Sequence, residues 1–315
     1  MTPPRRILIV VHPYRQDARQ LAADVIERLT LAGIEVCVDP LVAESLSGSV
    51  GPVSLPADPA RAADGCELVL VLGGDGTILR GAELSRGSGA PLLGINLGHV
   101  GFLAESERKD THTTIDRIVA QDYTVTERMT VDVVSYRQGQ EFYRTWALNE
   151  ATVEKVARER MLELTVEVDG RPLSTWGCDG VVMATPTGST AYAFSAGGPI
   201  VWPDLDAILL VPISAHALFT RPLVLGPRSR IAVEVIPGTQ GSGVLWCDGR
   251  RSVDLPPGAR IEVCRSEQPV RLARLSGDPF TDRLVEKLRL PIHGWRGAPA
   301  ADAIPVLRHS FEPGP

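Results

Sequence analysis

The residues best suited to chemistry are one carboxylate and one hydroxyl set among glycines, in the segment Gly73-Gly74-Asp75-Gly76-Thr77. An apolar run at residues 68–72 precedes them and predicts a buried strand. Glycines let a ligand approach the backbone closely. The helical pattern at residues 78–85 would direct the positive end of its dipole at the same place. The pattern indicates a phosphate group beside Asp75, with a tight turn capped by Asp75 as the structural alternative.

A second glycine-rich segment, at residues 94–103, follows the next predicted strand. Two such segments at strand ends predict one crevice built from both, although two unrelated turns would give the same pattern. Phe102, next to Gly101, is either a core residue or a platform for a planar ring. Asn149 and Glu150 follow an apolar run; an amide beside a carboxylate can bind adjacent ribose hydroxyls, or can simply form a turn.

A third segment, residues 185–199, combines hydroxyl-bearing residues, small residues and glycines with the rings of Tyr192 and Phe194. This composition is poor core material. It suits a ligand that needs close backbone approach, hydrogen bonds and ring stacking. A polar surface loop is the alternative, but it leaves the two rings unexplained.

Strand and helix patterns alternate in the first third of the chain, which predicts a parallel α/β layer. Ligands of such folds bind beyond the carboxyl ends of the strands, where residues 73–77 lie. The predicted strands are residues 7–11, 34–38, 68–72 and 91–95, the helices 17–31 and 78–85, and the loop 41–63.

After about residue 122 the pattern changes to short strands and tight turns, which predicts a mostly antiparallel β domain. Asp169-Gly170 and Asp248-Gly249 are the clearest turns. An amphipathic helix at residues 278–290 is expected to pack back on the sheet of the first domain. The expected division is a first domain of residues 1–122 and 278–296, a second domain of residues 123–277, and a mobile tail at 297–315.

Composition excludes several classes of protein. The chain has 315 residues, which favours two domains, and a net charge of −6, which gives no support to a nucleic-acid partner. It has no apolar run of membrane-spanning length, and its five scattered cysteines suggest a reducing cytoplasm. It lacks a Gly-x-Gly-x-x-Gly after the first strand and the Gly-Lys of a Walker A loop. Histidine spacing predicts no metal site held by the protein alone.

Taken in order, these segments resemble the bacterial NAD kinases, most closely those of actinobacteria. The loop at residues 73–77 is only moderately specific, because diacylglycerol and sphingosine kinases and 6-phosphofructokinases share a similar one. Asn149-Glu150 and residues 185–199 make the resemblance specific. It implies a Rossmann-like N-terminal domain, a C-terminal β sandwich, and transfer of a phosphoryl group from ATP to the 2′-hydroxyl of the adenosine ribose of NAD, giving NADP.

The resemblance also implies a role for individual residues. Asp75 would accept the hydroxyl proton, and Gly73, Gly74 and Thr77 would form the phosphate loop. Arg160 and Arg250 lie where the family contacts substrate with variable residue types. The residues expected to bind NAD are Asp75, Gly76, Arg80, Phe102, Asn149, Glu150, Arg160, Asp179, Thr190, Ala191, Tyr192, Ala193, Phe194, Ser195 and Arg250.

Similar enzymes are homo-oligomers, dimers or tetramers, in which a neighbouring subunit completes the NAD site; the second domain would carry that contact. Mg²⁺ or another divalent ion is expected with the donor phosphates. Polyphosphate is a further donor for several such enzymes.

Two other functions fit parts of the pattern. A lipid kinase of the diacylglycerol type shares the glycine loop but needs an apolar acceptor pocket, whereas residues 185–195 offer hydrogen bonds. A non-catalytic NAD(P)-binding regulator on the same scaffold would bind without forming NADP, and the presence of Asp75 argues against it.

Overall fold

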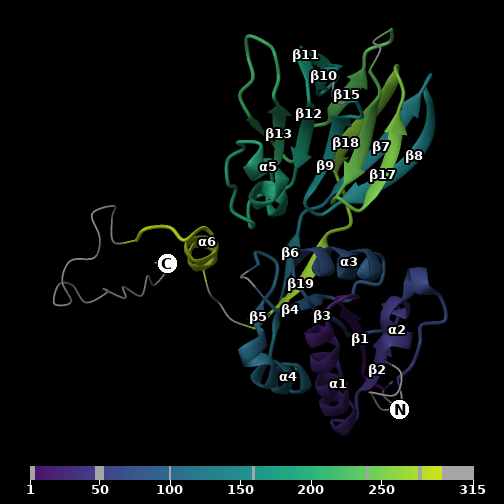
Figure 1. Ribbon diagram of the computed structural model, residues 1–315, viewed down its shortest axis with the longest axis vertical. Helices are drawn as coiled ribbons and strands as arrows, with labels where there is room; N and C mark the ends of the chain where they lie inside the picture. Colours follow the sequence, from purple (N-terminus) through teal and green to yellow (C-terminus); the bar gives the residue numbers. More distant parts are fainter. Residues whose placement is uncertain are drawn as a thin grey trace, which may run out of the picture.

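The chain forms an α/β unit and a β sandwich in a computed structural model (Figure 1) that describes residues 4–46, 53–98, 101–157, 160–238, 241–275 and 279–292. Both parts of the expected fold class are confirmed. Among these residues, no helix is long and apolar enough to cross a membrane.

The α/β unit is built on a seven-stranded sheet with strand order β2-β1-β3-β4-β19-β6, and β5 pairs with β4. Strands β1 to β5 are parallel, and β6 runs antiparallel to β19. The four strands predicted in the first third are confirmed. The strands are β1 (Arg6–Val11), β2 (Glu35–Val38), β3 (Leu68–Leu72), β4 (Leu92–Asn96), β5 (Ser106–Glu107), β6 (Thr124–Arg128) and β19 (Val270–Arg274).

Helices cover both faces of this sheet because its strands are apolar on both sides. In β1, Ile7 and Ile9 pack with α1 and α4, whereas Leu8 and Val10 pack with α3. Helix α3 thereby lies between the sheet and the sandwich (Figure 1). The prediction of a continuous loop at residues 41–63 is wrong, because two short helices form there. The helices are α1 (Gln16–Leu31), α2 (Pro40–Leu46), α3 (Asp75–Ser85), α4 (Thr111–Val119) and the 3₁₀ turns η1 (Pro59–Arg61) and η2 (Arg108–Asp110).

The sandwich consists of two antiparallel six-stranded sheets, ordered β11-β10-β15-β18-β7-β8 and β14-β13-β12-β9-β16-β17. Apolar residues of both sheets form one shared core. The strands are β7 (Val131–Arg137), β8 (Gln140–Ala147), β9 (Glu150–Lys155), β10 (Leu162–Val168), β11 (Arg171–Cys178), β12 (Gly180–Ala184), β13 (Ile208–Ile213), β14 (Leu223–Leu225), β15 (Ile231–Val235), β16 (Gly243–Cys247), β17 (Arg251–Leu255) and β18 (Ala259–Arg265).

The two Asp-Gly turns form as predicted. Asp169 and Gly170 have φ of 53° and 73°, and Asp248 and Gly249 have φ of 54° and 62°. Positive φ at both central residues is the signature of the hairpin turn whose twist matches its strands.

Two strands lie in a different unit from the one expected for a division at residue 122. Strands β6 and β19, expected in the second domain, extend the first sheet. They pair with each other over five residue pairs, and β19 adjoins β4. Two neighbouring strands, one entering and one leaving the sandwich, therefore connect the units.

Helix α6 (Phe280–Leu288) forms where an amphipathic helix was predicted, but it does not cover the sheet. None of its residues is buried. Phe280 contacts the ring of Phe102 at a centroid distance of 6.0 Å and that of Trp202, in the sandwich unit, at 5.2 Å. The expected contact with the first domain is thus made through the loop after β4, because the sheet faces are already occupied by α1, α3 and α4. The predicted tail at residues 297–315 lies outside the described residues.

Candidate active site

Asp75 lies where the two glycine-rich segments of the first unit meet. It is the first residue of α3, at the carboxyl end of β3. Its carboxylate accepts hydrogen bonds from the backbone N–H of Phe102 at 3.3 Å and of Leu103 at 3.2 Å. A Cβ at Gly101 would lie 2.5 Å from Oδ1 of Asp75, so only glycine allows this approach. The fold thus brings the two glycine-rich segments into contact at Asp75.

The capping alternative for Asp75 is wrong. The helix cap is Gly74, and no side chain bonds the first turn. The carboxylate of Asp75 extends to the second loop instead. A Cβ at Gly74 or Gly76 would meet nothing within 4 Å, so the loop has open space above it, whereas one at Gly73 would collide with Thr77. The loop therefore exposes its backbone at the positive end of α3, as an anion site requires.

The backbone of the turn that carries Asn149 is bound by the carboxylate of Asp248. This side chain, 6% exposed, accepts backbone N–H bonds from Leu148 at 3.0 Å, Asn149 at 2.7 Å and Glu150 at 3.3 Å. The guanidinium of Arg251 donates to the same carboxylate at 2.8 Å. Three N–H donors on one carboxylate fix the backbone of the turn.

The carbonyl groups of the same turn are bound by Thr185, which directly follows β12. The hydroxyl of Thr185 donates to the carbonyl of Leu148 at 2.5 Å, and its backbone N–H donates to the carbonyl of Asn149 at 2.9 Å. Gly188 packs so closely on that carbonyl that no Cβ could be accommodated. Thr185 and Gly188 belong to the third predicted segment, which the fold thus brings onto Asn149.

Glu150 is an unusual carboxyl group, only 8% exposed. Burial, and then the charge of Asp248, raise the pKa of Glu150 to about 8, although a hydrogen bond from the backbone N–H of Tyr192 opposes the shift. Its Oε2 atom has no hydrogen-bond partner among the described residues. At neutral pH this group is therefore largely protonated and can donate a hydrogen bond to a ligand.

Residues 190–195 surround this carboxyl group in two short helical turns, η3 (Thr187–Thr190) and α5 (Tyr192–Ser195). Tyr192 and Phe194 are exposed, with 37% and 42% of their surface accessible. Ala193 was expected to contact a ligand, but its methyl group is fully buried in the core under α5. The outward positions of this turn, Thr190, Ala191, Tyr192, Phe194 and Ser195, are partly or fully exposed.

Asp179 lies near the same tyrosine. The ammonium group of Lys155, 2.5 Å from its carboxylate, lowers the pKa of Asp179. Desolvation, then the charges of Glu154, Asp179 and Glu150, raise the pKa of Tyr192. These groups form one polar cluster on the sandwich side of the site.

The three arginines expected to bind NAD lie in different surroundings. Arg80 donates to both carboxylate oxygens of the buried Asp39 at 2.6 and 2.8 Å. Arg250 lies 3.1 Å from the carboxylate of Glu83 on α3. Arg160 lines a separate cavity of about 580 Å³ that shares no lining residue with the cavity next to Asp75.

A cavity of about 330 Å³ separates the two units beside Asp75. Phe102 and Leu103, whose N–H groups hold Asp75, line it from the first unit. Thr187 and Thr190 line it from the second. Of the residues predicted for the site, Phe102 of the first unit and Thr190 of the second thus line the same cavity.

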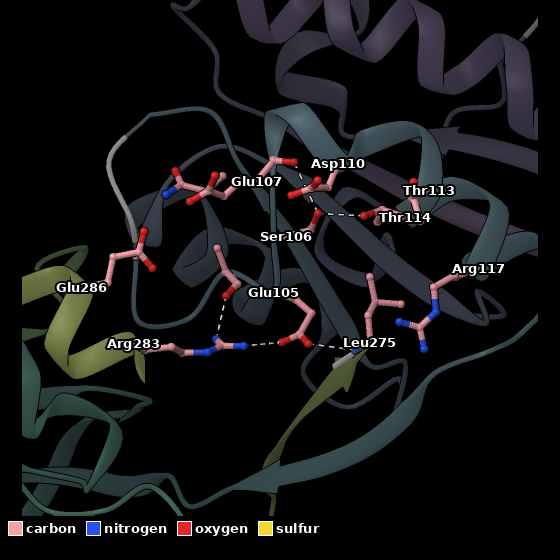
Figure 2. A pocket seen from close by; sticks show the side chains of 13 residues that line it. Glu105, Ser106, Glu107, Asp110, Thr113, Thr114, Arg117, Leu275, Arg283 and Glu286 are labelled. Atoms are coloured by element: carbon pink, nitrogen blue, oxygen red, sulfur yellow. Dashed lines mark hydrogen bonds and ion pairs between the residues drawn. The ribbon is translucent and has the colours of Figure 1, made fainter. Parts of the chain in front are cut away.

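A second cavity, of about 380 Å³, has Glu105, Thr114 and Arg283 in its lining (Figure 2). Figure 2 shows Arg283 of α6 extending toward Glu105. It donates to the carboxylate of Glu105 at 2.7 Å and to the carbonyl of Ala104 at 2.7 Å. These bonds tie α6 to the loop that holds Asp75.

No group of three or more His, Cys, Asp or Glu side chains that could hold a metal ion occurs among the described residues. Mg²⁺ commonly binds through one or two carboxylates together with substrate phosphates, so it does not need such a group.

Sequence reasoning missed the residues that support the site. Asp248 was assigned only to a turn, although a buried Asp-Gly at a hairpin end can also bind neighbouring N–H groups. Glu83 and Arg251, which lie 3.1 Å apart, had no recognisable pattern. Their roles depend on contacts between units.

Comparison with known proteins agrees with this geometry. The model of the ATP-NAD kinase N-terminal domain matches residues 7–123, and that of the ATP-NAD kinase C-terminal domain matches residues 148–275. NAD kinase of Thermobifida fusca is 58% identical over 303 residues, covering 94% of this chain and 93% of the relative. NAD kinase 2 of Streptomyces coelicolor is 57% identical over 296 residues, covering 94% and 98%.

Solved structures show the same similarity. Yeast NADH kinase complexed with NADH superposes with a TM-score of 0.83 at 27% identity, covering 92% of this chain and 89% of that one. An NAD kinase from Archaeoglobus fulgidus in complex with ATP has a TM-score of 0.68 at 27% identity, covering 90% and 98%. These matches favour a kinase acting on NAD over a lipid kinase or a non-catalytic regulator. With two family models spanning most of its length and relatives more than half identical to it, the chain belongs to the NAD kinase family.

Proposed function

We propose that the chain transfers a phosphoryl group from ATP to the 2′-hydroxyl of the adenosine ribose of NAD, giving NADP, with Asp75 as the general base. The observation that carries the proposal is the position of the Asp75 carboxylate. Two backbone N–H groups hold it at the amino end of α3, beside the cavity between the units. A carboxylate fixed in this way can accept a proton from an alcohol as the phosphoryl group arrives.

Positioning supplies much of the rate in phosphoryl transfer, because the transition state is loose. Phe102 and Leu103 orient Asp75 through their N–H groups. The open backbone at Gly74 and Gly76 leaves room for phosphate oxygens at the positive end of α3. Mg²⁺, bound through the donor phosphates and assisted by Asp75, would neutralise their charge.

The sandwich unit would hold the dinucleotide. Asn149 and the protonated Glu150 offer an amide and a carboxyl donor on a turn fixed by Asp248. The unpartnered Oε2 of Glu150 supports a ligand at this position, since buried polar atoms are normally hydrogen-bonded. Asp179, Tyr192 and Ser195 would complete the polar contacts.

Assembly and location belong to the same proposal. Arg160 lines a separate cavity in one chain, and a neighbouring copy in a homo-oligomer, a dimer or a tetramer, would supply it to the NAD site. Arg80 and Arg250 would act from their ion pairs at the rim. We place the enzyme in the cytoplasm. Polyphosphate is proposed as a second donor.

The test is NADP formation by the purified chain from NAD with ATP and Mg²⁺, with NADH and polyphosphate in parallel reactions. For Asp75→Asn we expect kcat to fall by about 10²–10⁴-fold, the usual contribution of a general base, while KM for NAD changes little. Asp254→Asn, an exposed site on β17, is the matched control and should retain full activity. A loss smaller than about tenfold in Asp75→Asn would disprove the base role.

A further inference from the structure

Three arginines line the cavity between the two units. Arg128 comes from the end of β6, Arg274 from the end of β19 and Arg283 from α6. The lining also contains the hydroxyls of Thr187 and Thr190. None of the three arginines belongs to the glycine-rich segments or to the NAD-binding set expected from the sequence.

The three arginines differ in the carboxylates near them. Arg274 and Arg283 both pair with Glu105, at 3.1 and 2.7 Å, and this carboxylate is 1% exposed. Arg128 has no carboxylate within ion-pair distance in the described part of the chain; its hydrogen bond goes to the carbonyl of Glu127 at 3.3 Å. Asp204, which is exposed, is the acidic residue of the lining.

Arg128 is desolvated at some cost. Burial, then the charge of Arg283, lower the pKa of Arg128, whereas Asp204 and Glu105 raise it. The half-buried guanidinium of Arg128 has no carboxylate beside it in the described part of the chain to offset this cost. A bound anion removes this cost, and phosphate oxygens match the fork of arginine N–H groups.

We propose that this cavity binds the phosphate chain of the phosphoryl donor, with Arg128 as its principal anchor. The inference rests on the proposed function. Phe102 and Leu103 line the cavity and also hold Asp75 by their N–H groups, so phosphates bound there adjoin the general base. The hydroxyl of Thr187 supplies a further polar group from the opposite unit, next to Thr190, whose hydroxyl donates to the carbonyl of Thr187 at 3.3 Å.

Binding is tested without turnover by calorimetry with inorganic tripolyphosphate, ATP and adenosine as separate ligands. We expect tripolyphosphate and ATP to bind wild type, and Arg128→Gln to weaken both by about 10- to 100-fold, the usual effect of losing a hydrogen bond to a charged group. Arg128→Lys should weaken them less, because it keeps the charge but loses the fork. ATP binding without tripolyphosphate binding would place recognition in the nucleoside and overturn the proposal.

Kinetics separate the donor from the acceptor. In Arg128→Gln, kcat/KM for ATP should fall by about 10- to 100-fold, while KM for NAD changes less than about threefold. Equal effects on both substrates would overturn the proposal, since they indicate a structural role or an NAD contact. Arg144→Gln, which removes an exposed arginine paired with Glu141, is the control and should alter neither.

Folding and function are also distinguishable. Arg128→Gln removes a half-buried charge that has no carboxylate partner in the described part of the chain, so Tm should not fall. Tripolyphosphate binding needs no reaction, so an absence of NADP formation would refute the proposed function alone. A wild-type chain that binds neither tripolyphosphate nor ATP would refute the anion site alone.

Discussion

At the scale of single residues, two carboxyl groups of the site are placed in opposite ways. Asp75 accepts hydrogen bonds from two backbone N–H groups at the amino end of a helix. Glu150 is buried near Asp248, which favours its protonated form. One site thereby presents a proton acceptor and a hydrogen-bond donor, both made from acidic side chains.

Glu150 should make stability depend on pH. Its pKa of about 8 in the folded chain exceeds the ordinary value of 4.5. Between these values the unfolded chain loses a proton that the folded chain keeps, so the free energy of unfolding falls as pH rises, by up to about 1.4 kcal/mol per pH unit. Glu150→Gln removes this loss, and its urea midpoint should rise relative to wild type from about pH 5 to about pH 8. Parallel midpoints across that range would contradict the protonated assignment.

At the scale of elements, the two Asp-Gly turns between strands have different binding partners although their sequences are alike. The Asp248 turn joins β16 to β17 and binds three N–H groups before β9. The Asp169 turn joins β10 to β11 and accepts from the N–H of Arg230 at 2.8 Å on the exposed surface. The same dipeptide thus supports the site in one place and a hairpin in the other.

Replacing each aspartate in turn tests this difference. Asp248→Asn loses one anionic acceptor and its pair with Arg251, and we expect about 2–4 kcal/mol less stability and about a tenfold higher KM for NAD. Asp169→Asn, the matched control, should cost less than about 1 kcal/mol and leave KM unchanged. Denaturation by urea and initial rates measure both. Equal KM values in the two variants would show that Asp248 does not position Asn149.

At the scale of the whole molecule, α3 connects the two units. It begins at Asp75, and near its end Glu83 lies 3.1 Å from both Arg250 and Arg251 of the sandwich. Arg86 and Arg251 lie over the ring of Trp146 at 4.0 and 4.6 Å. Figure 1 shows this helix between the sheet and the sandwich, where it sets the position of the base relative to the NAD-binding unit.

Glu83→Gln should therefore affect both stability and rate. Two arginines lose their shared carboxylate, and the side chain of one of them, Arg251, is largely buried, so we expect about 1–3 kcal/mol less stability and a lower kcat. Glu141→Gln breaks an exposed pair with Arg144 and should cost about 0–1 kcal/mol without changing kcat. A kcat equal to wild type in Glu83→Gln would contradict the role of α3 in alignment.

The sequence by itself determined the features that depend on neighbouring residues. Apolar periodicity predicted β3 and most of α1. The Asp-Gly dipeptides, which readily adopt positive φ, predicted the two hairpin turns. The loop at residues 73–77 was recognisable because its glycines and carboxylate lie within one strand-to-helix connection. Together, these local patterns predicted the α/β unit, the β unit and the proposed site of phosphoryl transfer.

Only the tertiary structure decided which distant residues meet. The bond from Leu103 to Asp75 spans 28 residues, and the bond from Asn149 to Asp248 spans 99. Arg128 and Arg283 reach one cavity because β6 and β19 cross into the first sheet and α6 follows β19. Local sequence encodes the conformation of a segment, but the carboxylates and guanidiniums of this site acquire their partners from segments far apart in the chain. The proposed base was thus visible in the sequence, whereas its supports and the arginine-lined cavity were not.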